Sequence, residues 1–119
     1  MTRRFISTGS IYESLAGYSR AVAEGNWVFV SGTVGADFAT GRFADGVVAQ
    51  TEQAIDTIEW ALGEADATVL DVVRVRVIVP NPADVAAVSG VVARRLGPAR
   101  AANTTICSPL AVPEALVEI

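Results

Sequence analysis

The chain contains no lysine and no histidine, and all nine of its basic residues are arginine. Schiff-base chemistry and covalent attachment of pyridoxal phosphate both require a lysine amine, so they are excluded. An imidazole general base is excluded too, and a metal site loses its commonest ligand. Aspartate and glutamate do not cluster at a recognisable loop spacing. We therefore expect no bound metal.

Cysteine is nearly absent as well. Cys107 stands alone, so it cannot form an internal disulfide, which agrees with a reducing compartment. Apolar runs fall far short of the roughly 18–20 residues that span a bilayer. Residues 1–4 lead into a mixed segment and not into the apolar core of a signal peptide. We expect a cytoplasmic protein with no membrane contact.

Positive charge is also in short supply. The net charge is -4 and the isoelectric point is near 4.6, which disfavours a nucleic-acid partner because phosphate binding needs clustered cations. By contrast, 51% of the residues are hydrophobic, a high share for a monomer of 119 residues, and such a surplus often covers a subunit interface. The length fits one domain, so we expect a single domain over residues 1–119 that forms an oligomer.

The first third of the chain has the pattern of short strands. Strands are predicted at residues 5–8, 18–23 and 27–31, and the last two flank the turn-rich tripeptide Glu24-Gly25-Asn26. This arrangement predicts an antiparallel hairpin. Residues 37–42 have the composition of a turn, in which Gly41 is available for a positive φ.

The remaining segments alternate between helix and strand. Apolar residues at steps of three and four predict a helix that begins at an N-cap, Asp45, and stops at Gly63. Residues 70–79 alternate, with valines 73, 75, 77 and 79 on one face and Arg74, Arg76 and Ile78 on the other. A second helix starts at Asn81-Pro82 and ends before Gly97-Pro98. Two strands, 103–107 and 116–119, close the chain.

This order predicts an α+β fold in which two helices cover one face of a mixed sheet. The other face is left uncovered, and the simplest cover for it is a second copy of the chain. The last strand reaches Ile119 before its expected length is complete, so we expect a few further C-terminal residues that this numbering lacks.

Six segments carry a resemblance to a known family, in order and over nearly the whole chain. They are residues 16–22 (AGYSRAV), 28–32 (VFVSG), 40–41 (TG), 50–53 (QTEQ), 71–77 (DVVRVRV) and 116–119 (LVEI). Together they resemble the RidA/YjgF family of reactive intermediate deaminases.

The resemblance implies a chorismate-mutase-like fold and a homotrimer whose sheets line a central β-barrel, with pockets between subunits. Well-studied members hydrolyse enamines and imines such as 2-aminoacrylate to 2-keto acids and ammonia. They need neither a cofactor nor a metal, so the resemblance implies a small-molecule substrate and no cofactor.

Four site residues follow from the resemblance. Tyr18 matches the tyrosine of a glycine-proline-tyrosine segment, although Ala16-Gly17 precedes it here. Ser31 and Gly32 match a serine-glycine pair whose hydroxyl and backbone amide face the pocket. Glu118 matches the acidic residue that positions the attacking water. From the residues alone, a tyrosine at the start of a strand such as Tyr18 is more often a packing residue, and Ser31-Gly32 could be a strand end.

The chain departs from the family at the arginine of a proline-alanine-arginine segment, which grips the substrate carboxylate. Two alignments compete. Pro98-Ala99-Arg100 keeps the arginine but leaves extra residues before Glu118, whereas counting back from Glu118 places Asn103 in the arginine's position. We favour the second, because residues 103–107 form the better strand. In that alignment the usual cation for a substrate carboxylate is missing.

Two other arginines could supply the cation. Arg76 shares a strand face with Arg74, although an ordinary ion pair is the simpler role for either, and Arg100 could fold over the pocket mouth. Cys107 lies near a pocket cysteine of some members, but a buried inert thiol is the simpler interpretation.

The leading hypothesis is an imine or enamine hydrolase or tautomerase, in which amides near Ser31-Gly32 polarise the substrate and Glu118 orients water. The alternative is a trimeric protein that binds or senses a small ligand without turnover, which Asn103 in the arginine position would favour. A ribonuclease, an activity attached to some relatives, ranks last because of the acidic charge and the missing lysine and histidine.

Overall fold

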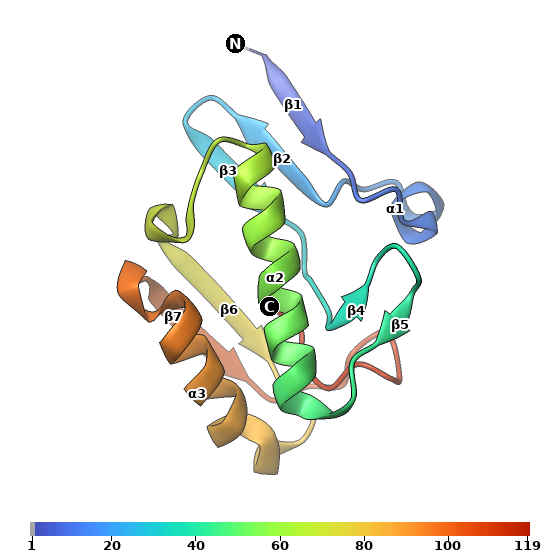
Figure 1. Cartoon of the computed structure of the whole chain (residues 1–119), viewed down its shortest axis with the longest axis vertical. Coiled ribbons are helices and arrows are strands. Elements are labelled where there is room, and N and C mark those ends of the chain that lie inside the picture. Colours follow the sequence, from blue (N-terminus) through green and yellow to red (C-terminus); the bar gives the residue numbers. More distant parts are fainter. Residues whose placement is uncertain (1) are drawn as a thin grey trace.

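The computed structural model describes residues 2–119 (Figure 1). Seven strands, three α-helices and three single-turn 3₁₀ helices follow one another within that range. Their order is β1 Arg3–Ile6, α1 Ile11–Ala16, β2 Ala21–Glu24, β3 Trp27–Val30, β4 Ala36–Asp37, β5 Arg42–Phe43, α2 Gly46–Glu64, η1 Val69–Asp71, β6 Arg74–Ile78, η2 Pro82–Asp84, α3 Val85–Leu96, η3 Gly97–Ala99 and β7 Ala102–Ile106. The predicted α+β class is confirmed, and α2 and α3 lie side by side on one face of the strands (Figure 1).

The predicted hairpin is present. β2 pairs antiparallel with β3 and, on its other side, with β1. One face of these strands carries small side chains, and Ala21 and Ala23 pack against Ala61 of α2 and against Ala65, which follows that helix. Alanines on both surfaces let the helix approach the sheet closely. The opposite face carries Phe5, which is 66% exposed.

The second sheet contains β6 and β7, which run parallel. Val75 and Val77 of β6 turn toward the helices and join the main core with Ile55 of α2 and Val88 of α3. Arg74 and Arg76 therefore point to the face that no helix covers, because alternate side chains of a strand lie on opposite faces.

The C-terminal residues join the two sheets. Thr33 and Ile119 exchange backbone hydrogen bonds of 2.8 and 2.9 Å, and Ile78 and Glu118 exchange bonds of 2.8 and 2.9 Å. The strand predicted at residues 116–119 is therefore not formed, and Glu118 makes isolated bridges to Val34 and Ile78 in its place. Glu118 is held by its backbone between β6 and the segment that follows β3.

Several predicted boundaries differ from the structure, among them the start of β6 and the end of α2. Residues 70–73 are not strand, because the Thr68 and Asp71 side chains form a capping box that folds Val69–Asp71 into a 3₁₀ turn. Val73 is consequently 61% exposed. The helix α2 passes through Gly63, which was the predicted stop, and ends at Glu64 with Ala65 as its C-cap.

Helix α1 was not predicted. Its N-cap is Ser10, whose hydroxyl accepts a hydrogen bond from the Tyr12 amide, and its C-cap is Gly17 at φ 70°. Both signals are visible in the sequence. The helix has only six residues, too few to show an apolar period.

Candidate active site

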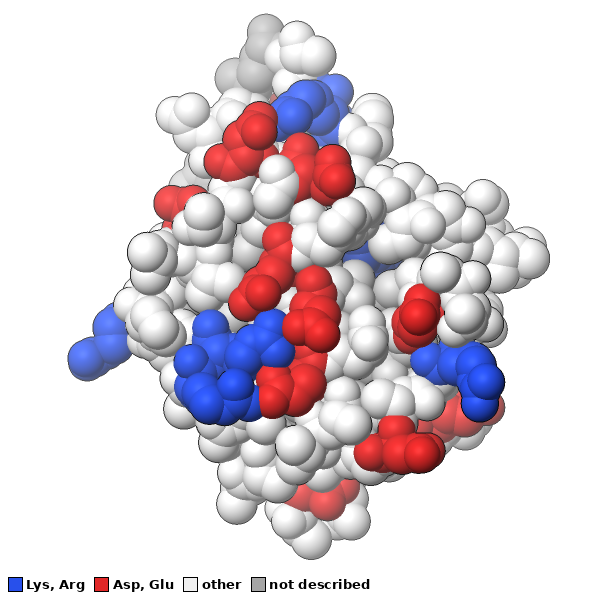
Figure 2. Space-filling view, viewed as in Figure 1, with Lys and Arg blue, Asp and Glu red and all other residues white. Residues whose placement is uncertain are grey.

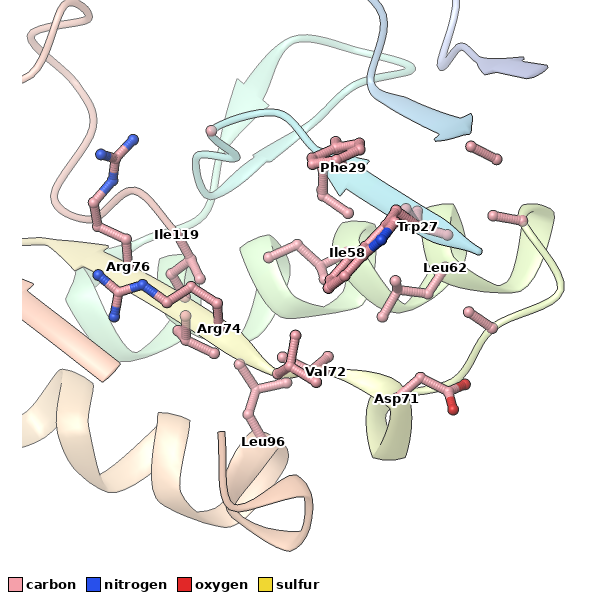
Figure 3. Close-up of a pocket in the computed structure, with 18 of the residues that line it drawn as sticks. Trp27, Phe29, Ile58, Leu62, Asp71, Val72, Arg74, Arg76, Leu96 and Ile119 are labelled. Carbon is pink, nitrogen blue, oxygen red and sulfur yellow. The ribbon is translucent and has the colours of Figure 1, made fainter. Parts of the chain in front are cut away.

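A groove of about 1130 Å³ separates β3 from β6. Trp27 and Phe29 of β3 stand on one side, and Arg74 and Arg76 of β6 stand on the other (Figure 3). Its apolar floor includes Ile58 of α2. The groove is larger than a small metabolite requires. Gly32 and Glu118 also line the groove.

Gly32 and Glu118 are in close contact. A Cβ atom added at Gly32 would lie 2.9 Å from the Glu118 carboxyl carbon and 3.0 and 3.2 Å from its two oxygens. Only glycine leaves this space for the carboxylate. The Gly32 amide has no hydrogen-bond acceptor among residues 2–119, so a carboxylate and a free backbone N–H lie at one place.

A buried glutamine anchors the segment that carries Glu118. The Gln50 side chain of α2 accepts a hydrogen bond from the Leu116 amide at 2.8 Å and donates to the Glu114 carbonyl at 3.1 Å. Gly35 packs directly on Gln50, because a Cβ there would lie 2.4 Å from the Gln50 backbone. Helix α2 thus fixes the approach of the chain to Glu118.

Ser31 and Tyr18 do not line the groove, and each contacts a residue near the start of β2. The Ser31 hydroxyl donates to the Ser19 carbonyl at 2.6 Å. The Tyr18 ring stacks on the Arg20 guanidinium, with its centroid 5.6 Å from the central carbon. Both residues therefore support the segment around Gly32.

Arg76 lies on the same open face as Glu118 and lines the same groove. In Figure 3 Arg76 and Ile119 lie at one end of the groove, while Trp27, Leu62 and Asp71 lie toward the other. The Arg74 guanidinium already has a partner, since it donates a hydrogen bond to the Thr104 hydroxyl at 2.7 Å. Arg76 makes no ion pair within the described range 2–119.

The other three candidates do not join Glu118 within one chain. Asn103 borders a second, smaller pocket of about 270 Å³ with Val77 and Ser89, which places it on the helix side of the sheet. Arg100 is exposed at φ 52° in the loop before β7, and Cys107 is also exposed. The predicted burial of the Cys107 thiol was therefore wrong.

The remaining arginines on the helix face belong to a surface ion-pair cluster. Figure 2 shows cations beside a row of acidic side chains, and the contacts join Arg94 and Arg95 of α3 to three carboxylates of α2. Hydrogen bonding from Arg95, which outweighs burial, lowers the pKa of Glu52. Hydrogen bonding to Asp56, followed by Glu52 and Glu59, raises the pKa of Arg95. This cluster joins the two helices and lies apart from the groove.

Among residues 2–119, no group of three potential metal-ligating side chains comes together. Over the same residues, no helix is both long and apolar enough to cross a membrane.

Comparison with known proteins identifies the family. A family model described as "Endoribonuclease L-PSP" matches residues 8–119. The crystal structure of Rv2704 from Mycobacterium tuberculosis, described as a member of the YjgF/YER057c/UK114 family, superposes with a TM-score of 0.88 at 40% identity, covering 98% of this chain and 94% of that one. The chain belongs to the YjgF/RidA family.

Further YjgF/RidA relatives agree with this assignment. A protein of Capra hircus named 2-iminobutanoate/2-iminopropanoate deaminase is 32% identical over 113 residues, which are 92% of this chain and 82% of that protein. RidA from the Antarctic bacterium Psychrobacter sp. PAMC 21119 superposes with a TM-score of 0.78 at 28% identity and covers 96% of this chain and 88% of that one. The family thus includes proteins named as imine deaminases.

Two residues beside the YjgF/RidA site were missed in the sequence. Arg20 is 1% exposed, and Glu13 is also buried. Burial raises the pKa of Glu13, but hydrogen bonds from Thr8 and Ser7 and the charge of Arg20 outweigh it, so this pKa lies below its usual range. Charged residues are rarely buried, so nothing in the residue pattern marked either one.

Proposed function

We propose that the protein hydrolyses a small reactive imine or enamine at the junction of Gly32 and Glu118. The observation that carries this proposal is the contact between the Glu118 carboxyl and the backbone of Gly32, whose N–H is a free donor. A carboxylate that accepts protons and an amide that donates a hydrogen bond suit addition of water to a C=N bond.

The proposed reaction balances without any other reactant. Glu118 takes a proton from water as the water oxygen bonds to the imine carbon, and it passes that proton to the nitrogen to give a carbinolamine. Glu118 then takes the hydroxyl proton of the carbinolamine and delivers it to the amino nitrogen as the C–N bond breaks, which releases ammonia, leaves a carbonyl group and regenerates the carboxylate. An enamine first moves a proton to its terminal carbon to become the imine. Such substrates are already reactive, so orientation and hydrogen bonding suffice as the catalytic contribution.

Arg76 is the proposed substrate cation. It lines the groove on the same face as Glu118 and has no acidic partner among residues 2–119, whereas Arg74 is bound to Thr104. A substrate carboxylate would accept hydrogen bonds from the Arg76 guanidinium. A charge-assisted hydrogen bond contributes about 1.5–3 kcal/mol, so Arg76→Gln should raise KM for an imino acid by roughly 10–100-fold. The matched variant Arg74→Gln should change KM by less than about 3-fold.

The fold also supports a homotrimer, which we propose as the working assembly. Trp27 and Phe29 are each 60% exposed on the sheet face that the helices leave uncovered. Exposed aromatics in a row are typical of a subunit interface. Arg100, Asn103 and Cys107, which lie apart from Glu118 in one chain, could then reach a neighbour's site. Light scattering should give three times the 12.4 kDa mass of the chain, and a monomer would refute the assembly.

The test of function is release of ammonia from 2-aminoacrylate generated in situ. We expect the wild-type protein to exceed the rate in buffer, and equality with buffer would refute hydrolysis of this substrate class. Protection of the protein against heat by metabolites, without product, would instead support the ligand-binding alternative. Salt-dependent RNA binding, which we do not expect at a net charge of -4, would reopen the ribonuclease interpretation.

A further inference from the structure

Arg20 is a buried cation that forms no direct ion pair, and the buried Glu13, whose pKa its charge lowers, is the carboxylate that feels it. Arg20 precedes β2, its side chain is 1% exposed, and it forms no ion pair with any of residues 2–119. Removal of a guanidinium from water is costly unless hydrogen bonds and nearby charge compensate. The contacts of the Arg20 guanidinium must therefore offset the cost of its burial.

The partners of Arg20 belong to the segment around Gly32. One guanidinium nitrogen, Nη1, donates to the Gly32 carbonyl at 3.0 Å and to the Thr33 hydroxyl at 2.9 Å. The Arg20 backbone carbonyl accepts from the Ser31 amide at 3.0 Å. Arg20 thus holds residues 31–33 through its backbone and its side chain together.

Two aromatic rings hold the guanidinium in place. Its central carbon lies 4.8 Å from the Phe38 ring centroid and 5.6 Å from the Tyr18 ring centroid. Both distances are within the range of cation–π attraction. The rings restrict the guanidinium to the orientation that reaches Gly32.

The segment that Arg20 holds is the one that positions Glu118. Thr33 exchanges two backbone hydrogen bonds with Ile119, the residue after Glu118, and Gly32 contacts the Glu118 carboxyl itself. We propose that Arg20 is a positioning residue that fixes the Gly32 amide and the Glu118 carboxylate relative to each other. This inference rests on the function proposed above.

A lysine in place of Arg20 could not make the same contacts. An ammonium carries the same charge, but it lacks the planar fork that lets a guanidinium stack between rings while it donates to two oxygens. Arg20→Lys should therefore recover only part of the wild-type rate. Arg20→Met removes the charge and the donors, and Arg42→Met, at an exposed arginine of β5, is the matched control.

The first measurement is kcat and KM for the in situ imino acid, below the Tm of the least stable variant. We expect Arg20→Met to lower kcat by about 10–100-fold while KM changes by less than about 3-fold, because the proposed substrate cation lies on β6. Arg42→Met should match the wild type. To separate positioning from stability, Arg20→Met is repeated with Gly90→Ala, which adds stability in α3. A wild-type kcat in folded Arg20→Met, or one restored by Gly90→Ala, would overturn the inference.

The second measurement does not need activity. In ¹H–¹⁵N spectra, Arg20→Met should shift the backbone amides of Gly32 and Ile119, and Arg42→Met should leave them in place. If the wild type fails to hydrolyse any imine while these shifts appear, the proposed function fails and the positioning contact stands. Unchanged Gly32 and Ile119 resonances in Arg20→Met would refute the positioning role whatever the activity.

Discussion

Replacing Gly32 with alanine would place a methyl group against the Glu118 carboxyl. The new Cβ would meet the carboxyl carbon at 2.9 Å, well inside the contact distance that carbon atoms tolerate. The carboxyl group must retreat by about 0.5 Å to restore an ordinary contact. Glu118 is half-buried, and its two backbone hydrogen bonds to Ile78 do not depend on the carboxyl position. The side chain can therefore move while the backbone stays.

The expected consequence is a loss of rate with little loss of stability. A misplacement of 1 Å costs about 100-fold in rate, so a shift of half that size should lower kcat by about 10-fold. The unfolding free energy should change by less than about 1 kcal/mol, because the clash involves the end of a side chain. Gly35→Ala should instead lower the unfolding free energy, since its Cβ would lie 2.4 Å from the backbone of Gln50 and not from the end of a side chain.

The assay compares imine hydrolysis and urea unfolding for Gly32→Ala, Gly35→Ala and Gly63→Ala. Nothing lies within 4 Å of a Cβ at Gly63, so this variant controls for glycine replacement itself and should keep the wild-type rate. A Gly32→Ala protein with full activity would refute the role of this contact. One that unfolds like Gly35→Ala would refute the claim that only the carboxyl group must move.

Three further predictions concern stability. Gly90→Ala, inside α3 with nothing within 4 Å of its Cβ, should add about 0.5–1 kcal/mol and raise Tm by roughly 3–6 °C in calorimetry. Arg95→Met should lower Tm by a few degrees at pH 7. The difference in Tm from the wild type should shrink in 1 M salt, because salt screens the ion pairs that Arg95 makes. It should also shrink as the pH falls through the depressed pKa of Glu52, because protonation of Glu52 removes the same ion pairs. Because the folded-state pKa of Glu13 is lowered, the ionised carboxylate stabilises the fold above about pH 4.5, and this stabilisation is lost at lower pH. In urea unfolding, Glu13→Gln should have a smaller unfolding free energy than the wild type at pH 7. Its unfolding free energy should also fall less than that of the wild type as the pH is lowered.

The elements with a clear period could be predicted from the sequence. The apolar residues spaced by three and four after Asp45 predicted α2, and alternation predicted β6 with Arg74 and Arg76 away from the core. The boundaries failed where local side-chain hydrogen bonds competed with the period, as at the Thr68–Asp71 capping box.

The candidate site could be predicted only in part. Gly32 and Glu118 do meet, as their family positions suggest, and Arg76 shares their groove. The face of Asn103 is set by the register of β7 with β6, in which Asn103 lies opposite Val75, and no local pattern in the sequence fixes that register. Arg20 could not be found because its burial comes from contacts with residues 12 and 13 positions away, and no local pattern encodes them.

The most direct test of the proposed chemistry is the rate of ammonia release by Glu118→Gln. The substitution preserves the shape of the side chain and removes its ability to accept a proton from water. We expect kcat to fall by about 100–10,000-fold while KM and Tm stay near the wild-type values. A Glu118→Gln protein that hydrolyses 2-aminoacrylate at the wild-type rate would contradict the assignment of the reaction to the junction of Gly32 and Glu118.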